Sequence, residues 1–285
     1  MKIIIAKDAG YCFGVRDAVD LAYDIANTNG NVYMLGDIVH NEKVVENLNK
    51  AGSKVVNNLE DIPDGSSVLF RAHGTSNDIW ENAKNKDINI VDATCPLVHE
   101  IHNEVKKISK DGRQIIVIGD HNHDEVVAIA DQVPETIVVS NSDEANALKK
   151  YKKAGVVSQS TQTIENVKDI INILMIKVFD LHFVNTICYP TKRNQEQIKE
   201  LAKVCDLMII IGSFTSANSK RLTLLSKNIN HNTYQVTCAK DLDKNWFKNV
   251  TKIGVSAGAS TPDYLIMEVK EKIEEIGDCD EKKYN

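Results

Sequence analysis

Three cysteines occupy equivalent places in the chain. Cys12, Cys95 and Cys188 each follow a short apolar run and precede a segment with helical character, and they lie 83 and 93 residues apart. A lone cysteine is most often a small buried residue, but thiolates also ligate zinc and iron–sulfur clusters. Three interpretations therefore stay open: buried thiols, a zinc site of three Cys and one His, or a cluster with one iron open to substrate.

The spacing excludes some of the possible metal sites. The sequence contains no CxxC pair, so a zinc ribbon or a ferredoxin-type run is excluded and any metal site must be assembled from distant segments. One cysteine in each of three similar stretches favours a cluster with an open iron, which could act as a Lewis acid, over closed structural zinc. Cys205 and Cys238 lie in or near apolar runs and are expected to be core residues.

Small and polar residues gather where the predicted strands end. In parallel α/β units, ligands bind beyond the carboxyl ends of the strands, so a shared pocket would explain this repetition. The stretches concerned are GDIVHN, RAHGTS, DATC, GDHNHDE, SQST, TIC, GSFTSANS and SAGAST.

Several of these stretches suit an anion. Ser216, Ala217 and Asn218 lie at a predicted helix N-terminus, where backbone N–H groups and the helix dipole favour phosphate. Ser260 precedes another helix, and His40 and His73 lie in similar loops where they could donate to phosphate oxygens. Each residue alone would be interpreted as a helix cap or a solvated histidine. Their repetition indicates a phosphate-binding pocket.

The stretch from His123 to Glu125 is the best acid–base candidate. A glutamate in a closed pocket can have its pKa raised until it donates a proton near neutrality, and Thr161 could relay that proton. The alternative is that Asp124 and Glu125 only favour the first turn of a helix.

The elements that must position these residues alternate between strand and helix. This alternation predicts α/β architecture with mainly parallel sheets, in three small domains at 1–95, 96–187 and 188–285. The N-terminal strand could pack with the third domain. We expect helices over 42–50 and 142–150, a strand over 182–187, and a charged tail from residue 277.

Bulk composition limits the function classes. The 285 residues are 42% hydrophobic and 26% charged, and the net charge of −6 gives no general attraction to nucleic acid or to an anionic membrane. No apolar stretch is long enough to span a membrane, and the first residues are unlike a signal peptide. The sequence therefore predicts a cytoplasmic protein with no nucleic-acid or membrane partner.

Taken together, the motifs resemble those of the 4-hydroxy-3-methylbut-2-enyl diphosphate reductases, in order and at family-like spacing from residue 1 to about 276. The resemblance implies three α/β domains in a trefoil around a central 4Fe–4S cluster. It also implies reductive dehydration of the allylic diphosphate to isopentenyl and dimethylallyl diphosphate, the last step of the non-mevalonate isoprenoid pathway. The motifs are AGYCFGVRDAV, GDIVHN, RAHGT, VDATCP, HDE, SQST, TICYPT, GSFTSANS and SAGASTP.

The resemblance also implies a role for each site residue. Cluster ligation falls on Cys12, Cys95 and Cys188, and proton delivery on Glu125. Hydroxyl relay or substrate contact falls on Ser160 and Thr161. Diphosphate binding falls on the remaining residues, which are His40, His73, His123, Ser216, Asn218 and Ser260.

Two positions depart from the family pattern. Ala217 stands where a second serine is common, so one hydroxyl is lost although a backbone N–H can still donate. Ser160 stands where a threonine is usual, which keeps the hydroxyl. The resemblance further implies reduced ferredoxin or flavodoxin as electron donor, a monomer or weak homo-oligomer, and possible conversion of the cluster to a 3Fe–4S form in oxygen-exposed samples. An iron–sulfur hydro-lyase and a cluster-based redox sensor are the alternatives.

Overall fold

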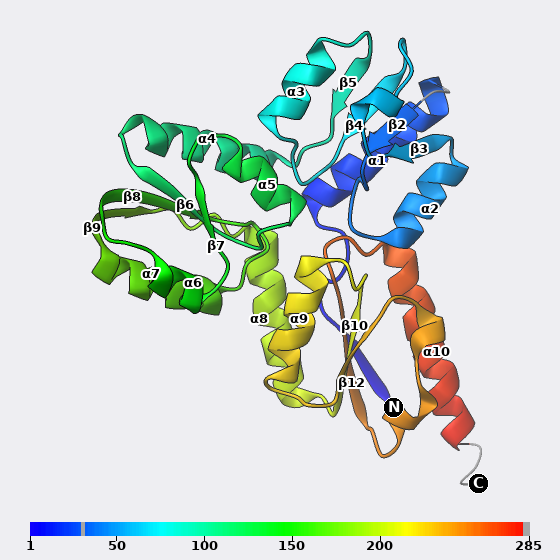
Figure 1. Ribbon diagram of the computed structural model, residues 1–285. Coiled ribbons are helices and arrows are strands. Elements are labelled where there is room, and N and C mark those ends of the chain that lie inside the picture. Colours follow the sequence, from blue (N-terminus) through cyan, green and yellow to red (C-terminus); the bar gives the residue numbers. More distant parts are fainter. Residues whose placement is uncertain (30–31, 282–285) are drawn as a thin grey trace. The chain divides into compact units, whose positions relative to one another are not determined.

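The computed structural model describes residues 1–29 and 32–281 and contains three four-stranded sheets (Figure 1). Every strand pair in all three sheets is parallel, which confirms the predicted α/β class. By contacts the chain forms two compact units: unit 1 comprises Met1–Phe13, His40–Val44 and Tyr189–Asn285, and unit 2 comprises Gly14–Val39 and Val45–Cys188. None of the described helices is both long and apolar enough to cross a membrane.

Unit 1 contains one sheet, in the order β1-β12-β10-β11. The first strand of the chain therefore pairs with the last, with Lys2 opposite Lys252. The elements of this unit are β1 (Lys2–Ile5), α8 (Tyr189–Val204), β10 (Leu207–Ile211), α9 (Ala217–Lys227), β11 (Thr233–Val236), the 3₁₀ turns η2 (Ala239–Asp241) and η3 (Lys244–Phe247), β12 (Lys252–Ala257) and α10 (Asp263–Glu281).

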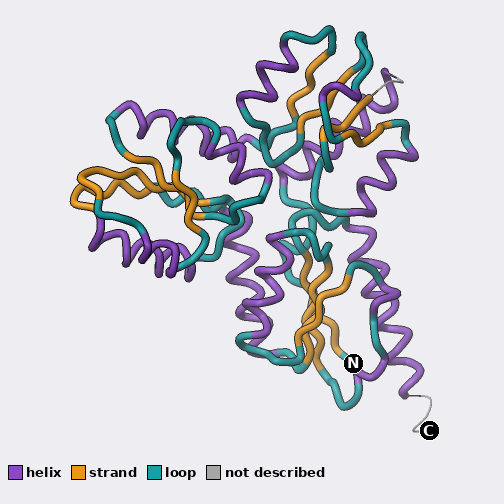
Figure 2. The backbone as a smooth tube through the Cα atoms, in the orientation of Figure 1, coloured by secondary structure: helices purple, strands orange, loops and turns teal. Residues whose placement is uncertain are grey.

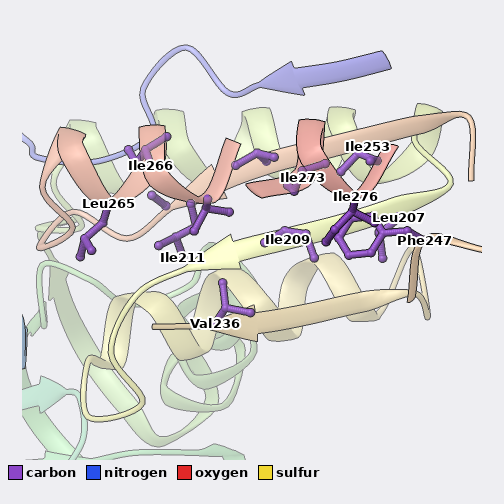
Figure 3. Packing of buried hydrophobic residues seen from close by; sticks show 13 residues of the cluster. Leu207, Ile209, Ile211, Val236, Phe247, Ile253, Leu265, Ile266, Ile273 and Ile276 are labelled. Carbon is purple, nitrogen blue, oxygen red and sulfur yellow. The ribbon is translucent and has the colours of Figure 1, made fainter. Parts of the chain in front are cut away.

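Both faces of this sheet are buried because alternate side chains of β10 point to opposite helix layers. Ile209 and Ile211 pack against α10, where Ile273 contributes to the same cluster (Figure 3). Met208 and Ile210 pack on the other side, against α8 and α9. The continuous apolar run of β10 is thus explained by burial on both faces.

Unit 2 contains two sheets. The first has the order β3-β2-β4-β5, and the 3₁₀ turn η1 and helix α3 pack on one of its faces, over Val68 and Phe70. Its elements are α1 (Phe13–Asn29, which begins at the last residue of a unit 1 segment), β2 (Val32–Leu35), α2 (Glu42–Lys50, which also begins in unit 1), β3 (Ser53–Val56), η1 (Leu59–Asp61), β4 (Ser67–Phe70), α3 (Asn77–Lys84) and β5 (Asn89–Asp92).

The second sheet of unit 2 has the order β7-β6-β8-β9 and lies between two helix layers (Figure 2). Ile116 and Ile118 face α6 and α7, whereas Ile115 and Val117 face α4 and α5. The elements are α4 (Pro96–Lys110), β6 (Gln114–Ile118), α5 (Asp124–Ala130), β7 (Ile137–Val139), α6 (Ser142–Ala147), β8 (Tyr151–Ser158), α7 (Ile164–Lys177) and β9 (Val178–Phe183).

Three predicted element boundaries were wrong, and one strand was not predicted. The chain forms the unexpected strand β3, because residues 53–56 pair with β2. Helix α6 ends at Ala147, since the next strand already begins at Tyr151. Strand β9 covers 178–183 and not 182–187, because it follows α7 with no turn residue between them and pairs with β8 from Tyr151 onward. Helix α10 continues to Glu281, and the rest of the expected tail, 282–285, lies outside the described residues.

Candidate functional site

In unit 2, the carboxyl edge of the β7-β6-β8-β9 sheet holds a buried acid. Glu125 lies in the first turn of α5 and is only 1% exposed. The Ser160 N–H donates to its Oε1 at 2.6 Å and the Ser160 hydroxyl donates to its Oε2 at 2.9 Å. Glu125 thus does more than favour a helix start, because both its oxygens are held by one residue that follows a neighbouring strand.

The segments that precede Glu125 and Ser160 are hydrogen-bonded to each other. The Gln159 N–H donates to Ile118 O at 2.8 Å, and the Gln159 side-chain oxygen accepts from the Asp120 N–H at 3.2 Å. Gly119 lies so close to Gln159 that an added Cβ would be 3.1 Å from the Cβ of that glutamine. These contacts hold the Ser160 hydroxyl next to the Glu125 carboxylate at the carboxyl ends of the strands.

Two histidines accompany this acid. His123 caps α5, and its Nδ1 accepts the Glu125 N–H at 3.2 Å, so the neutral ring carries its hydrogen on Nε2. His73, from the loop after β4, packs edge-on against His123 with ring centroids 5.5 Å apart. The neighbouring Asp124 forms an ion pair with Arg71. Both predicted histidines of unit 2 thus lie together beside Glu125.

Arg71 is a residue that the sequence analysis missed. Its guanidinium pairs with Asp124 and also donates from Nε to Leu35 O at 3.1 Å. Gly36 makes room for it, since a Cβ there would lie 2.5 Å from the guanidinium, and the φ of +72° also favours glycine. The available signal was the arginine that opens the RAHGT stretch, which was treated only as part of a polar loop.

Cys95 and Cys188 lie at two further strand ends of unit 2. The Cys95 N–H donates to Ala72 O at 3.0 Å, and Pro96 then starts α4. The Cys188 N–H donates to Ser160 O, also at 3.0 Å. Cys188 does not follow β9 directly but ends a short loop, 184–188. None of the five cysteines whose side chains the structure describes forms a disulfide.

A glycine adjoins the Cys95 thiol. The Gly14 Cα is so close that an added Cβ would collide with Cys95 Sγ, although both residues have ordinary backbone conformations. Within unit 2, the start of α1 is therefore packed against a predicted cluster ligand, and only a residue without a side chain fits there.

Behind the His73 loop lies a buried histidine of α4. An added Cβ on Gly74 would be 3.0 Å from the His102 ring, and the φ of +88° at Gly74 again requires glycine. Burial and the nearby His99 and Lys106 lower the pKa of His102 to about 4, although Asp92 opposes this shift. At neutral pH His102 is therefore an uncharged packing partner of the loop.

In unit 1, the predicted residues lie at the carboxyl edge of the other sheet. The Cys12 N–H donates to Ala259 O at 3.4 Å, which ties the segment after β1 to the loop after β12. The Ser260 hydroxyl donates to His40 O at 3.1 Å. Cys12, His40 and Ser260 are therefore brought together within this unit.

The N-terminus of α9 belongs to the same edge. Ser216 caps the helix, with its hydroxyl accepting the Ser219 N–H at 3.3 Å, and Ala217 is the first helical residue. Asn218 is 6% exposed, and within residues 1–29 and 32–281 neither of its amide atoms has a hydrogen-bond partner. A buried amide without a partner is costly, so this position is suited to a polar ligand. Gly258 approaches Ser219 closely enough that no other residue would fit.

Residues 3–274 match the sequence pattern of a family described as LytB protein. The chain belongs to the LytB family. Relatives named 4-hydroxy-3-methylbut-2-enyl diphosphate reductase include those of Geotalea uraniireducens, 41% identical over 97% of this chain and 98% of the relative, and of Aquifex aeolicus, 38% identical over 97% of each. The predicted membership of a reductase family is confirmed.

Solved structures agree with this assignment to the LytB family. The chain resembles the E-1-hydroxy-2-methyl-but-2-enyl-4-diphosphate reductase of Plasmodium falciparum with a TM-score of 0.90 and 32% identity, over 95% of this chain and 87% of that one. A second structure, of a diphosphate reductase described as the terminal enzyme of the non-mevalonate pathway, gives a TM-score of 0.72 at 37% identity, over 96% and 99%. The LytB match spans every predicted site residue, from Cys12 to Ser260.

Proposed function

We propose that this protein reduces 4-hydroxy-3-methylbut-2-enyl diphosphate to isopentenyl and dimethylallyl diphosphate. Two electrons and two protons enter, the allylic C–O bond breaks, the hydroxyl leaves as water and a carbon of the allyl group is protonated. The buried pair of Glu125 and Ser160 carries this proposal, because a dehydration needs a positioned proton donor at the leaving hydroxyl. Family membership supports the choice of substrate.

In this proposal Cys12, Cys95 and Cys188 would ligate a 4Fe–4S cluster. Each cysteine is half-buried, forms no disulfide and lies just before a helix, and the lack of a side chain at Gly14 leaves room for the Cys95 sulfur. Three thiolates can hold a cluster and leave one iron without a protein ligand. When bound, the cluster would pass the two electrons one at a time from an external reductant, and it would supply a Lewis-acidic iron for the hydroxyl oxygen.

Glu125 and Ser160 would deliver the proton. The Ser160 hydroxyl already donates to Glu125 Oε2, so a hydroxyl placed next to Ser160 could receive a proton that originates on the carboxyl group. Thr161, the next residue, would offer a second hydroxyl for substrate contact. Burial of Glu125 excludes bulk water, which keeps the proton transfer within the site.

The diphosphate would bind to the polar loops. Asn218 offers a buried amide N–H₂ that has no partner among the described residues, and Ser216, Ser260 and the backbone N–H of Ala217 lie in the same unit. Helix N-termini favour such anions. In unit 2, His73 and His123 would add ring N–H donors, and His40 would do so in unit 1.

Anaerobic reconstitution tests the reaction. The purified protein is loaded with iron and sulfide and then supplied with the diphosphate and either a chemical reductant, reduced ferredoxin or reduced flavodoxin. We expect both isoprenoid products only when a reductant is present, because the reaction consumes two electrons. Dehydration without a reductant would indicate a hydro-lyase, and an intact cluster without turnover would indicate a redox sensor.

Mössbauer spectra of the same samples test the cluster. We expect one iron site to change its spectrum when the substrate is added, because only that iron would lack a cysteine ligand. Four equivalent irons that ignore the substrate would contradict the proposed ligand set. We expect the protein to act in the cytoplasm.

A further inference from the structure

Large apolar side chains are exposed at one end of the β7-β6-β8-β9 sheet. Met175 and Ile176 near the end of α7 are 65% and 81% exposed, and Phe179 in β9 is 93% exposed. These residues lie within five positions of one another and at the junction of a helix and a strand. Contiguous exposed apolar surface of this kind is typical of an interaction site.

The same place has an unpaired sheet edge. Strand β9 pairs only with β8 and has six residues, whereas the other five edge strands in the described ranges have three or four. Proteins usually protect such edges with lysine, proline, bulges or short strands. Strand β9 contains neither lysine nor proline, so its backbone can accept another strand.

The hydrogen bonds to β8 show which backbone groups face outward. The Val184 N–H donates to Val156 O at 2.9 Å, toward β8. Backbone groups alternate in direction along a strand, so the N–H and C=O groups of Asp180 and His182 also point toward β8. Phe179, Leu181 and Phe183 therefore present their N–H and C=O groups at the free edge.

The sequence of β9 is symmetric in character about Leu181. Phe179 and Phe183 flank it on one face of the sheet, and Asp180 and His182 flank it on the other. If a second β9 pairs antiparallel with Leu181 on the two-fold axis, each Phe179 lies opposite a Phe183. Each Asp180 then lies opposite a His182, at the positions without backbone hydrogen bonds, where side chains approach most closely.

We propose that this edge is the interface between two copies of this chain, joined through β9 into one eight-stranded sheet. The occupant is a second copy because the strand complements itself, in apolar pairs on one face and in acid–base pairs on the other. Arg113 holds Asp180 ready for this contact, donating from both terminal nitrogens to its two oxygens at 2.9 and 3.1 Å. The pKa of Asp180 is lowered by these hydrogen bonds, so the carboxylate stays charged.

The proposed pairing leaves the candidate site accessible. The second copy is added beside β9, along the free side of that strand. Glu125 and Ser160 lie beyond the carboxyl ends of the strands, so the second copy does not cover them. Because the pairing is antiparallel, the carboxyl ends of the strands in the second copy point in the opposite direction.

Sedimentation velocity of the anaerobically purified holoprotein tests the interface. We expect a monomer–dimer equilibrium whose heavier species has twice the 31.7 kDa chain mass. Phe179→Lys should weaken dimerisation at least about tenfold, because it removes two apolar cross-strand pairs per dimer and adds charge at the edge. The matched control is Leu224→Lys in α9, another exposed apolar residue, which should leave the equilibrium unchanged.

The register is tested by two substitutions at one position. His182→Glu places a carboxylate opposite Asp180 twice per dimer and should weaken association about tenfold, whereas His182→Arg places a cation there and should not weaken association by more than about threefold. Monomers at every concentration would overturn the proposal. A dimer that is insensitive to Phe179→Lys, or that responds equally to both His182 variants, would overturn the proposed interface or its register.

Discussion

Ser160 connects two parts of the candidate site through three hydrogen bonds. Its N–H and its hydroxyl hold the two oxygens of Glu125, and its carbonyl accepts the N–H of Cys188. A movement of the Glu125 carboxyl group would therefore displace Cys188, which is proposed to ligate the cluster. A movement of Cys188 would likewise displace Glu125. The sequence analysis could suggest Ser160 only through a resemblance, because nothing in SQST by itself indicates three simultaneous contacts.

Replacing Glu125 by Gln should abolish most of the turnover while sparing the cluster. The amide keeps the volume of the side chain but cannot give up a proton at the leaving hydroxyl, and positioned acid catalysis contributes about 10²- to 10⁴-fold. We expect kcat to fall within that range, measured with excess reductant. Iron content and cluster absorbance should stay at the wild-type level.

The control for this variant is Glu268→Gln, on the exposed side of α10. It should leave both kcat and iron content unchanged. If Glu125→Gln retained full activity, the proton would come from another group and the acid role of Glu125 would be wrong.

A substitution at Ala217 is expected to improve substrate binding, whereas the Glu125 variant is expected to lose turnover. Ala217 is the first residue of α9, next to the buried amide of Asn218. Ala217→Ser adds a hydroxyl at a helix N-terminus, and one more hydrogen bond to phosphate should lower KM about two- to tenfold. Ala239→Ser, in the 3₁₀ turn η2, serves as the control and should leave KM unchanged. An unchanged KM in Ala217→Ser would indicate that the diphosphate does not reach this turn.

In the first turn of α1, the side chain at position 14 is limited in size by Cys95, which precedes α4. Gly14→Ala would improve the helix propensity of α1 but force a methyl group against Cys95 Sγ. We expect the displaced thiol to bind the cluster poorly, so iron content per chain should fall at least about twofold. Gly277→Ala in α10 is the matched control, since its methyl group meets only the flexible end of Met1. Full iron content in Gly14→Ala would contradict the assignment of Cys95.

The buried His102 of α4 should make stability depend on pH. Its pKa is about 4 in the folded chain against an ordinary 6.5, so the unfolded chain takes up a proton first as the pH falls. The contribution of His102 to stability is therefore complete above pH 6.5 and is lost progressively between pH 6.5 and 4, by about 3 kcal/mol. Below pH 4 this group causes no further loss.

Calorimetry at pH 7 and pH 5 measures this effect. The decrease in Tm on acidification should be smaller in His102→Leu than in the wild type, because leucine has no proton to bind. His231→Leu, at an exposed position, should behave like the wild type. Equal decreases in all three proteins would show that His102 does not carry the pH dependence.

Elements could be predicted where one physical signal dominated. The apolar runs of β6 and β10 and the helix start at Pro96 were found because burial on both faces and a proline at the first turn leave clear patterns. Strand β3 and the start of β9 could not be found, since their existence depends on pairing with β2 and β8. In the site, residue types at strand ends indicated Glu125 and Asn218, but the Arg71 ion pair needs a partner 53 positions away along the chain.

The whole molecule carries a net charge of −6 and builds unit 1 from three separate segments of sequence. Sequence periodicity alone suggested three successive rounds of strand and helix. It could only allow that the first strand joins the last sheet, because such pairing depends on contacts 250 residues apart. The parallel character of all three sheets did follow from the alternation of elements, since parallel neighbours require crossover helices.

The pairing of β1 with β12 has a consequence for how the chain is made. During synthesis β1 is made before the other strands, but among the described residues the strand it pairs with, β12, is the last one to be synthesised. Cys12 is tied down through Ala259, which is also translated late. Contacts of such long sequence separation form slowly. The Cys12 thiol is therefore fixed in its folded surroundings only when translation is nearly complete, so insertion of the proposed cluster would be a post-translational event.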